Sequence, residues 1–304
     1  MGYKKLSNEQ EVRLVQDYVD GCSVNVLMKK YGFKTKKSIT DKVKKHFPDT
    51  YKELIKKAQE NRKGYSYKLE KISNEFDAYF LGLLLTDGYV VLGNEGKKRY
   101  QTGIDLTDED CIAFLSKIIG KPYHCYKQAK EGHLPNGQIV VNRKLRYRLT
   151  LDDKELVQNL ERLGVIPNKS KIIKGPKLLP EEEKFIPYII RGIIDGDGTV
   201  SPTSYGTPQF RIVSASPDFI QWIKNTLENK MYMMDLHVRE TDQLYSIESA
   251  DKNNIEKLLA LSYNKPFGMM RKYNEIRKTF RDYNSNSLWD EGIVQTATEM
   301  ANES

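Results

Sequence analysis

The chain has 304 residues, a formal net charge of +8 and a pI of about 9.0, which is enough length for two or three domains that each bury a core. The excess of lysine and arginine favours a polyanionic partner, because cations that neutralise phosphates release condensed counterions. The three cysteines are scattered, which argues against a disulfide-stabilised fold, a cysteine metal site and cysteine catalysis.

The sequence shows no membrane or export signal. No apolar run is long enough to cross a bilayer, and the opening residues MGYKKLSNEQEV lack the apolar core of a signal peptide. We therefore expect no membrane association and an intracellular, cytoplasmic location, in a bacterial or phage-infected cell. The polar tail 285–304 is expected to be frayed or to form a late helix.

Residues 1–50 predict a small all-α domain of three helices. Ser7 is a suitable N-cap for the first helix, and Gly32 provides a tight turn before a third helix that begins at about Thr35. The third helix is basic on its outer face, and its candidate DNA contacts are Lys36, Lys37 and Lys44. This arrangement is typical of a helix-turn-helix whose last helix enters the major groove of DNA. A three-helix packing unit with a solvated lysine face is the alternative.

The next segment, 51–72, is polar and rich in lysine. Its composition predicts a basic linker with some helical structure.

The body of the chain contains an internal repeat. The segment FLGLLLTDGYV at 80–90 is echoed by IIRGIIDGDGTV at 189–200. Each copy is an apolar helical stretch in which a glycine precedes an aspartate by five residues. We expect two halves, at 73–180 and 181–284, related by pseudo-twofold symmetry. Each half is predicted to run helix, two strands, helix, two strands, helix, which is a duplicated αββαββα unit of the α+β class.

Polar and apolar residues alternate in three of the predicted strands. Period-two alternation indicates a sheet with one face on a core and one face open. An open face that carries arginine and glutamine offers the donors that contact guanine and adenine edges in the major groove. The candidate DNA-binding side chains are Arg99, Gln101, Lys144, Arg146, Arg148, Gln209 and Arg211. An ordinary sheet with solvated charges is the alternative.

The two glycine–aspartate motifs suggest a metal site between the halves. Gly82 and Gly192 fall in mid-helix, where glycine costs about 1 kcal/mol relative to alanine, a cost that is tolerated where two backbones approach closely. Packing through these glycines brings Asp87 and Asp197 together. Adjacent carboxylates repel unless they share a proton or a cation, and Mg²⁺ takes oxygen ligands. Further candidate ligands are the main-chain carbonyls of Thr86 and Gly196.

The segments FLGLLLTDG and IRGIIDGDG resemble the two LAGLIDADG motifs of the homing endonuclease family, in its single-chain form, over about residues 73–281. The second motif is the closer match, because the first has Leu85 and Thr86 where the family has an aspartate and a small residue. The metal-binding position of the family corresponds to Asp87 and Asp197.

The resemblance implies a homing-endonuclease fold in which the motif helices form the interface between the halves and two curved sheets lie across the major groove. It implies double-stranded DNA as the substrate and Mg²⁺ or Mn²⁺ as the cofactor, with double-strand breaks as the product. Ca²⁺ is expected to bind without supporting efficient cleavage. A single chain with both motifs implies a monomer that requires no protein partner.

The family also places a basic residue near the scissile phosphate in each half. The segment VIPNKSKII resembles that part of the first half, which assigns Lys169. The segment MMRKYNEI resembles the last helix of the family, which assigns Lys272 in the second half. The internal repeat instead pairs Asn168-Lys169 with Asn264-Lys265, so Lys265 is an alternative. Such a lysine can stabilise negative charge on the attacked phosphate.

Two other functions on the same fold stay open. A non-cleaving DNA-binding regulator is favoured by the helix-turn-helix, although both motif acids are present. An intron RNA maturase is disfavoured by the same module, because A-form RNA hides its major groove.

Overall fold

Two compact units make up the chain. Residues 1–67 and 119–121 belong to an N-terminal unit, and the rest belongs to a larger C-terminal unit. The computed structural model describes residues 6–20, 22, 24–92, 100–127, 131–133, 139–141, 145–203 and 207–283. Over these ranges, none of the helices is both long and apolar enough to cross a membrane.

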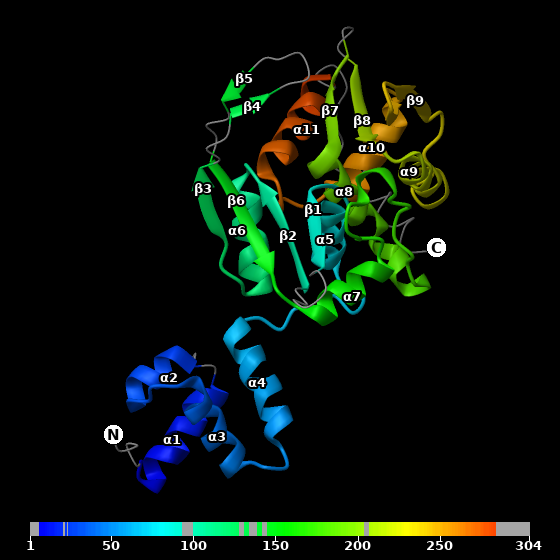
Figure 1. Ribbon diagram of the computed structural model, residues 1–304. Coiled ribbons are helices and arrows are strands. Elements are labelled where there is room, and N and C mark those ends of the chain that lie inside the picture. Colours follow the sequence, from blue (N-terminus) through cyan, green and yellow to red (C-terminus); the bar gives the residue numbers. More distant parts are fainter. Residues whose placement is uncertain are drawn as a thin grey trace. The chain divides into compact units, whose positions relative to one another are not determined.

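The described part of the N-terminal unit is helical. Its helices are α1 (Asn8–Val19), α2 (Val24–Tyr31), α3 (Lys36–His46) and α4 (Tyr51–Lys63) (Figure 1). Ser7 caps α1 in a capping box with Gln10, and the Thr35 side chain accepts a hydrogen bond from the main-chain N–H of Ser38 at the start of α3. The helices share one core, which contains Leu14, Leu27, Ile39, Val43 and Ala58.

The segment that we expected to be a basic linker contains α4, a full helix of the N-terminal unit. Ala58 is completely buried in the core of this unit, and Tyr51 and Leu54 pack against it. Gly64 ends the helix in the left-handed conformation with φ of 71°. The helix was hard to recognise in the sequence because its few apolar residues stand among lysines and other polar residues.

Part of the basic face of α3 pairs with α1. Lys42 contacts a carboxylate oxygen of Glu11, which is 6% exposed, and Nε2 of His46 lies 2.9 Å from the other oxygen. The hydrogen bonds from Lys42 and His46 lower the pKa of Glu11 to about 2. Exposed lysines of α3 include Lys36, Lys37 and Lys44.

The C-terminal unit is an α+β fold with two similar halves, as the repeat predicts. The first half contains α5 (Glu75–Thr86), β1 (Gly88–Leu92), β2 (Tyr100–Leu106), α6 (Glu109–Ile119), β3 (His124–Lys127), β6 (Leu145–Leu151) and α7 (Lys154–Arg162), with a hairpin of β4 (Glu131–His133) and β5 (Ile139–Val141). Short 3-10 turns at Lys169–Lys171 and Pro180–Phe185 lead to the second half.

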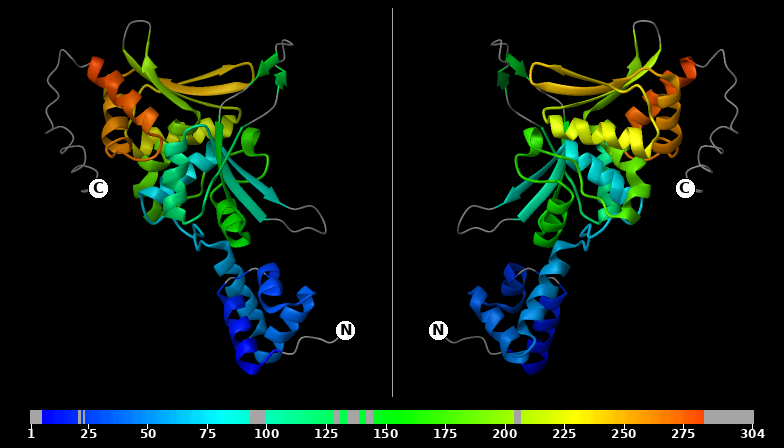
Figure 2. Two further views of the ribbon diagram at one scale, coloured as in Figure 1. Left: turned by 90° about the vertical axis from the view of Figure 1, so that its left-hand side faces the viewer. Right: turned by 90° about the vertical axis from the view of Figure 1, so that its right-hand side faces the viewer.

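The second half repeats this order. It contains α8 (Ile186–Asp197), β7 (Gly198–Pro202), β8 (Pro208–Ser214), α9 (Pro217–Lys230), β9 (His237–Thr241), β10 (Leu244–Ser249) and α10 (Lys252–Ser262), followed by α11 (Met270–Tyr283). The strand orders β1-β2-β6-β3 and β7-β8-β10-β9 are equivalent, and all pairings are antiparallel. The two sheets diverge from each other as they extend away from the paired helices α5 and α8 (Figure 2).

Close packing of α5 on α8 joins the halves. A Cβ atom built on Gly82 would lie 2.2 Å from the carbonyl oxygen of Ile189 and 2.8 Å from the Cα of Gly192. A Cβ on Gly192 would lie 2.3 Å from the carbonyl oxygen of Tyr79. The backbones therefore touch, and no side chain larger than hydrogen fits at either position.

We predict that Gly192→Ala destabilises the C-terminal unit by about 3 kcal/mol, because the new methyl group meets backbone atoms that cannot move aside without separating the helices. Ile190→Val, a one-carbon change at a fully buried position of the same helix, should cost only about 1 kcal/mol. Denaturant unfolding of the two variants measures the difference. Equal stabilities would show that the helices do not depend on this close approach.

Candidate functional site

The C-terminal ends of α5 and α8 place the two motif aspartates side by side. Asp87 is the C-cap residue of α5, and Asp197 is the last residue of α8. A Cβ atom built on Gly196 would lie 2.0 Å from Oγ1 of Thr86 and 3.0 Å from Oδ2 of Asp87. The helix ends are thus in contact, and glycine at position 196 leaves the space beside the Asp87 carboxylate open.

The surroundings of the two carboxylates disfavour a pair of negative charges. Both side chains are open to solvent on one side. Burial of the remainder raises the pKa of Asp87 to about 6, and the negative charge of Asp197 adds to the rise. Burial also raises the pKa of Asp197, while the charges of Lys169 and Lys272 oppose it. A site of this kind is stabilised by a proton or by a cation.

Each aspartate is accompanied by a lysine that binds the main-chain carbonyls on either side of it. In the first half, Nζ of Lys169 lies 2.8 Å from the oxygen of Thr86 and 2.7 Å from that of Gly88. In the second half, Nζ of Lys272 contacts the carbonyl oxygens of Ile194 at 2.8 Å, Gly196 at 3.4 Å and Gly198 at 2.7 Å. The two lysines therefore occupy equivalent positions around Asp87 and Asp197, and burial lowers the pKa of both amines.

Lys265, the alternative from the internal repeat, lies elsewhere. Its Nζ is 2.5 Å from Oε1 of Glu75, at the N-terminal end of α5. Lys169 and Lys265, which follow the two repeated asparagines, therefore do not occupy equivalent positions in the two halves. Lys169 lies in a 3-10 turn that follows α7, whereas its spatial counterpart, Lys272, lies on α11.

The position of Lys272 depends on the first half, which no pattern in the sequence indicates. The main-chain N–H of Met270, the first residue of α11, donates to Oδ2 of Asp110 at 3.0 Å. Nε of Arg271 lies 2.9 Å from Oδ1 of Asp108. Both acids lie at the start of α6 or just before it, so a first-half helix anchors the helix that carries the second-half lysine.

A buried polar cluster precedes Asp197 on α8, and sequence reasoning missed it. Asp195 is 1% exposed and accepts hydrogen bonds from the hydroxyls of Tyr79 and Tyr263, both at 2.8 Å. Arg191 is completely buried and donates to the carbonyl oxygen of Lys265 at 2.7 Å. The only sequence signal is a charged pair four residues apart in an apolar helix. The corresponding residues of α5 are Leu81 and Leu85.

The candidate DNA-binding residues of the strands fall into three groups. Open sheet faces carry Arg146, Arg148, Gln209 and Arg211. Gln101 is only 8% exposed, and its amide donates to Oδ1 of Asp152 at 2.7 Å. Its amide is thus engaged within the protein and not free on the open face. Arg99 and Lys144 lie outside the described residues.

The donors at the helix ends fit a hard divalent cation. Among the described residues, no group of three or more Asp, Glu, His or Cys side chains gathers around one point. A cation at Asp87 and Asp197 would therefore rely on two carboxylates, main-chain carbonyls, water and oxygens of the substrate, which is the ligand set that Mg²⁺ commonly takes. The carbonyls of Thr86 and Gly196 each retain a second lone pair beside their lysine contact.

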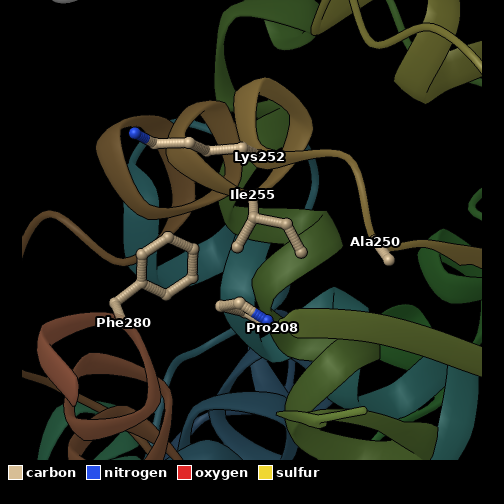
Figure 3. Close-up of a pocket in the computed structure, with 5 residues that line it drawn as sticks. All are labelled: Pro208, Ala250, Lys252, Ile255 and Phe280. Atoms are coloured by element: carbon tan, nitrogen blue, oxygen red, sulfur yellow. The ribbon is translucent and has the colours of Figure 1, made fainter. Parts of the chain in front are cut away.

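A small hollow lies apart from these helix ends. It is bordered by Pro208, Ala250, Lys252, Ile255 and Phe280 (Figure 3). Its lining is mostly apolar and includes neither the aspartates nor their lysines, and we assign no ligand to it.

Comparison with known proteins finds similarity in solved structures. No family model and no curated protein matches the sequence. The chain is similar to the homing endonuclease I-WcaI bound to its DNA recognition sequence, with a TM-score of 0.48, 14% identity and coverage of 67% of this chain and 87% of that one.

Two further structures are similar. Full-length DUF199/WhiA from Thermatoga maritima has a TM-score of 0.42 and 14% identity, covering 77% of this chain and 69% of that one. I-DmoI in complex with DNA and Mn has a TM-score of 0.38 and 16% identity, covering 62% and 96%. These likenesses concern the fold alone, so the function of this chain has to follow from its own residues.

We predict that Asp87→Asn stabilises the metal-free protein at neutral pH. The folded-state pKa of about 6 lies above the unfolded value of about 3.9. Stability from this carboxyl is therefore fully present below the unfolded pKa and is lost as the pH rises through about 6. Thermal unfolding in EDTA should show the wild type falling below the variant as the pH rises. Asp218→Asn, an exposed acid of α9, is the control. A difference between Asp87→Asn and wild type that does not change with pH would contradict the assigned pKa.

Proposed function

We propose that this chain is a site-specific DNA endonuclease of the LAGLIDADG type, which hydrolyses phosphodiester bonds and makes double-strand breaks in a long, degenerate target. The observation that carries the proposal is the pair of equivalent aspartate–lysine units, Asp87 with Lys169 and Asp197 with Lys272, at the touching ends of α5 and α8. Two equivalent centres side by side suit a reaction that must occur once on each strand of a duplex.

The acids and carbonyls would hold the cofactor. Asp87 and Asp197, with the main-chain carbonyls of Thr86 and Gly196, are the proposed ligands of Mg²⁺ or Mn²⁺. When bound, the divalent cation supplies Lewis-acid stabilisation of the phosphate and activates water. Ca²⁺ prefers a larger and less regular ligand shell, and we expect it to support binding without efficient cleavage.

The lysines would act on the attacked phosphate. Contacts with two or three main-chain carbonyls hold each ammonium group beside its aspartate. A preorganised positive charge at this point stabilises the negative charge that develops on the phosphate during hydrolysis. Because the carbonyl contacts orient the amine before substrate arrives, little reorganisation is needed in the transition state.

Duplex DNA is the proposed partner of both units. In the C-terminal unit, exposed Arg148 and Arg211 on the open sheet faces can donate to base edges in the major groove. In the N-terminal unit, the exposed lysines of α3 can neutralise phosphates as part of a helix-turn-helix. One chain carries both catalytic centres, so the proposed form is a monomer.

Incubation with a duplex library of randomised sequence and Mg²⁺, followed by sequencing of the cut ends, tests the proposed activity. Recurrent cuts on both strands of related sequences are expected. Selection of related sequences without any cut would instead indicate a DNA-binding regulator.

We predict that Asp87→Asn and Asp197→Asn each abolish double-strand cleavage and largely spare DNA binding, because a ligand for the cation is removed while the phosphate contacts remain. Lys169→Met and Lys272→Met should each slow cleavage by about 10²-fold or more, since each removes a preorganised charge from the transition state. EDTA should stop cleavage by the wild type.

The chain supplies matched controls for these variants. Lys265→Met and Asp218→Asn change the same residue types away from the helix ends, and both should cleave at the wild-type rate. Cleavage by Asp87→Asn at the wild-type rate, or equal losses in Lys265→Met and Lys272→Met, would contradict the proposed site.

We predict that replacing Lys36, Lys37 and Lys44 together by alanine weakens DNA binding and makes it less sensitive to salt. For each phosphate that is no longer neutralised, the slope of log K against log salt should fall in magnitude by about 0.9. Double replacement of the exposed Lys52 and Lys56 of α4 is the control for loss of charge alone. If both sets of variants change the slope equally per lysine, α3 has no special role in binding DNA.

A further inference from the structure

The open faces of both sheets carry arginines that contact an acid less exposed than themselves. In the first sheet, the carboxylate of Asp105 on β2 accepts two hydrogen bonds from arginine Nε atoms. Arg146 donates to Oδ1 at 2.8 Å, and Arg148 donates to Oδ2 at 2.9 Å. Nη2 of Arg148 also lies 2.6 Å from Oδ2. The hydroxyl of Tyr126 on β3 donates to the same carboxylate and accepts from Nη2 of Arg148 at 2.7 Å. We name these four residues the Asp105 cluster.

The exposures within the Asp105 cluster have a clear order. The Asp105 side chain is 14% exposed, whereas the side chains of Arg146 and Arg148 are 29% and 45% exposed. The acid therefore lies beneath the guanidinium groups and holds them by their inner edges. Both arginines bind Asp105 through Nε and Nη2, which leaves the Nη1 side of each guanidinium to offer donors of the kind that recognise guanine.

The second sheet contains a similar arrangement built from other strands. Glu248 of β10 is 7% exposed. Nε of Arg239 on β9 lies 2.6 Å from Oε1 of Glu248, and Nε of Arg211 on β8 lies 3.8 Å from Oε2. Nη2 of Arg211 also donates to Oγ of Ser246 at 3.4 Å. We name Glu248, Arg211 and Arg239 the Glu248 cluster.

Strand register shows where each cluster lies within its half. The glycine that follows each motif aspartate gives a common reference. Gly88 lies opposite Ile104 in the first sheet, and Gly198 lies opposite Ile212 in the second. The two isoleucines are therefore equivalent positions.

The clusters are displaced from each other along the sheets. Asp105 follows the reference isoleucine by one residue, and its counterpart in the second sheet is Val213. Arg211 precedes the reference isoleucine by one residue, and its counterpart in the first sheet is Gly103. The displacement of two residues is about 7 Å at the rise of a strand, or about two steps of a DNA duplex.

We propose that Asp105 and Glu248 are positioning residues for sequence recognition, which hold their arginines in place to contact bases. Because the two clusters are displaced, the base pairs contacted in the two half-sites would lie about two base pairs away from symmetric positions. This inference rests on the proposed DNA binding, but it does not require cleavage. An arginine held by its inner edge loses less conformational freedom when it binds a base. An arginine released from its acid is free to contact the nearest phosphate, which carries no sequence information.

The test is sequence discrimination of the full-length protein, measured as binding to a randomised duplex library with Ca²⁺ in place of Mg²⁺. Asp105→Asn should bind mixed sequences more tightly than the wild type, because a negative charge is removed. It should lose discrimination by about tenfold or more at one or two base pairs in one half-site. Arg148→Ala should lose discrimination at the same base pairs.

Further variants separate positioning from a structural role. Asp105→Glu keeps the carboxylate and should retain most of the discrimination. Tyr126→Phe removes only one hydroxyl from the cluster, and it should weaken discrimination at the same base pairs even if Asp105→Asn folds poorly. Glu248→Gln should act on the other half-site, about two base pairs farther from the cut. Asp242→Asn, an exposed acid of the β9–β10 turn, is the control for charge alone.

The positioning role would be overturned by unchanged discrimination in both Asp105→Asn and Tyr126→Phe, or by a loss spread evenly over the target. If Asp105→Asn and Glu248→Gln lose discrimination at symmetric base pairs of the two half-sites, the proposed displacement of about two base pairs would be wrong. Binding of selected sequences without cleavage in Mg²⁺ would contradict only the endonuclease assignment. Failure of the wild type to bind any duplex would overturn both.

Discussion

The contact between the backbones of α5 and α8 at Gly82 and Gly192 sets the geometry of both halves and of the site between them. Because no Cβ fits at either glycine, the two helix backbones are in direct contact, and their C-terminal ends meet. This contact brings Asp87 next to Asp197 and raises the pKa of Asp87. The packing of the core and the electrostatics of the site therefore have the same origin.

The two halves place their aspartates and lysines in the same arrangement, but their open sheet faces differ. Lys169 and Lys272 make equivalent contacts although they come from unrelated positions in the chain. In the proposed function, each of the two centres would act on one strand of a duplex. The open sheet faces differ between the halves, with Asp105 and Glu248 at non-equivalent positions.

The halves also differ in how they are held together. The buried cluster around Asp195 of α8 includes the hydroxyl of Tyr79 on α5, whereas α5 has leucines at the positions equivalent to Arg191 and Asp195. The main-chain N–H of Met269 then donates to that same hydroxyl, which ties the approach to α11 to the helix pair. These contacts add to those of Met270 and Arg271 with the start of α6, so residues of the first half hold both the approach to α11 and its first turn.

The duplicated α+β fold, the helices of the motifs and the glycines between them could be predicted from the chain alone, because they depend on periodicity and on a repeated local pattern. The features that escaped prediction depend on contacts between distant segments. The family resemblance assigned Lys272 and the internal repeat pointed to Lys265, and only the packing of α11 across the halves decides between them. The amide of Gln101 is taken up by Asp152, which a strand pattern cannot show. Ala58 makes α4 part of a core, because burial of one small side chain depends on the helices around it and not on the composition of its own segment.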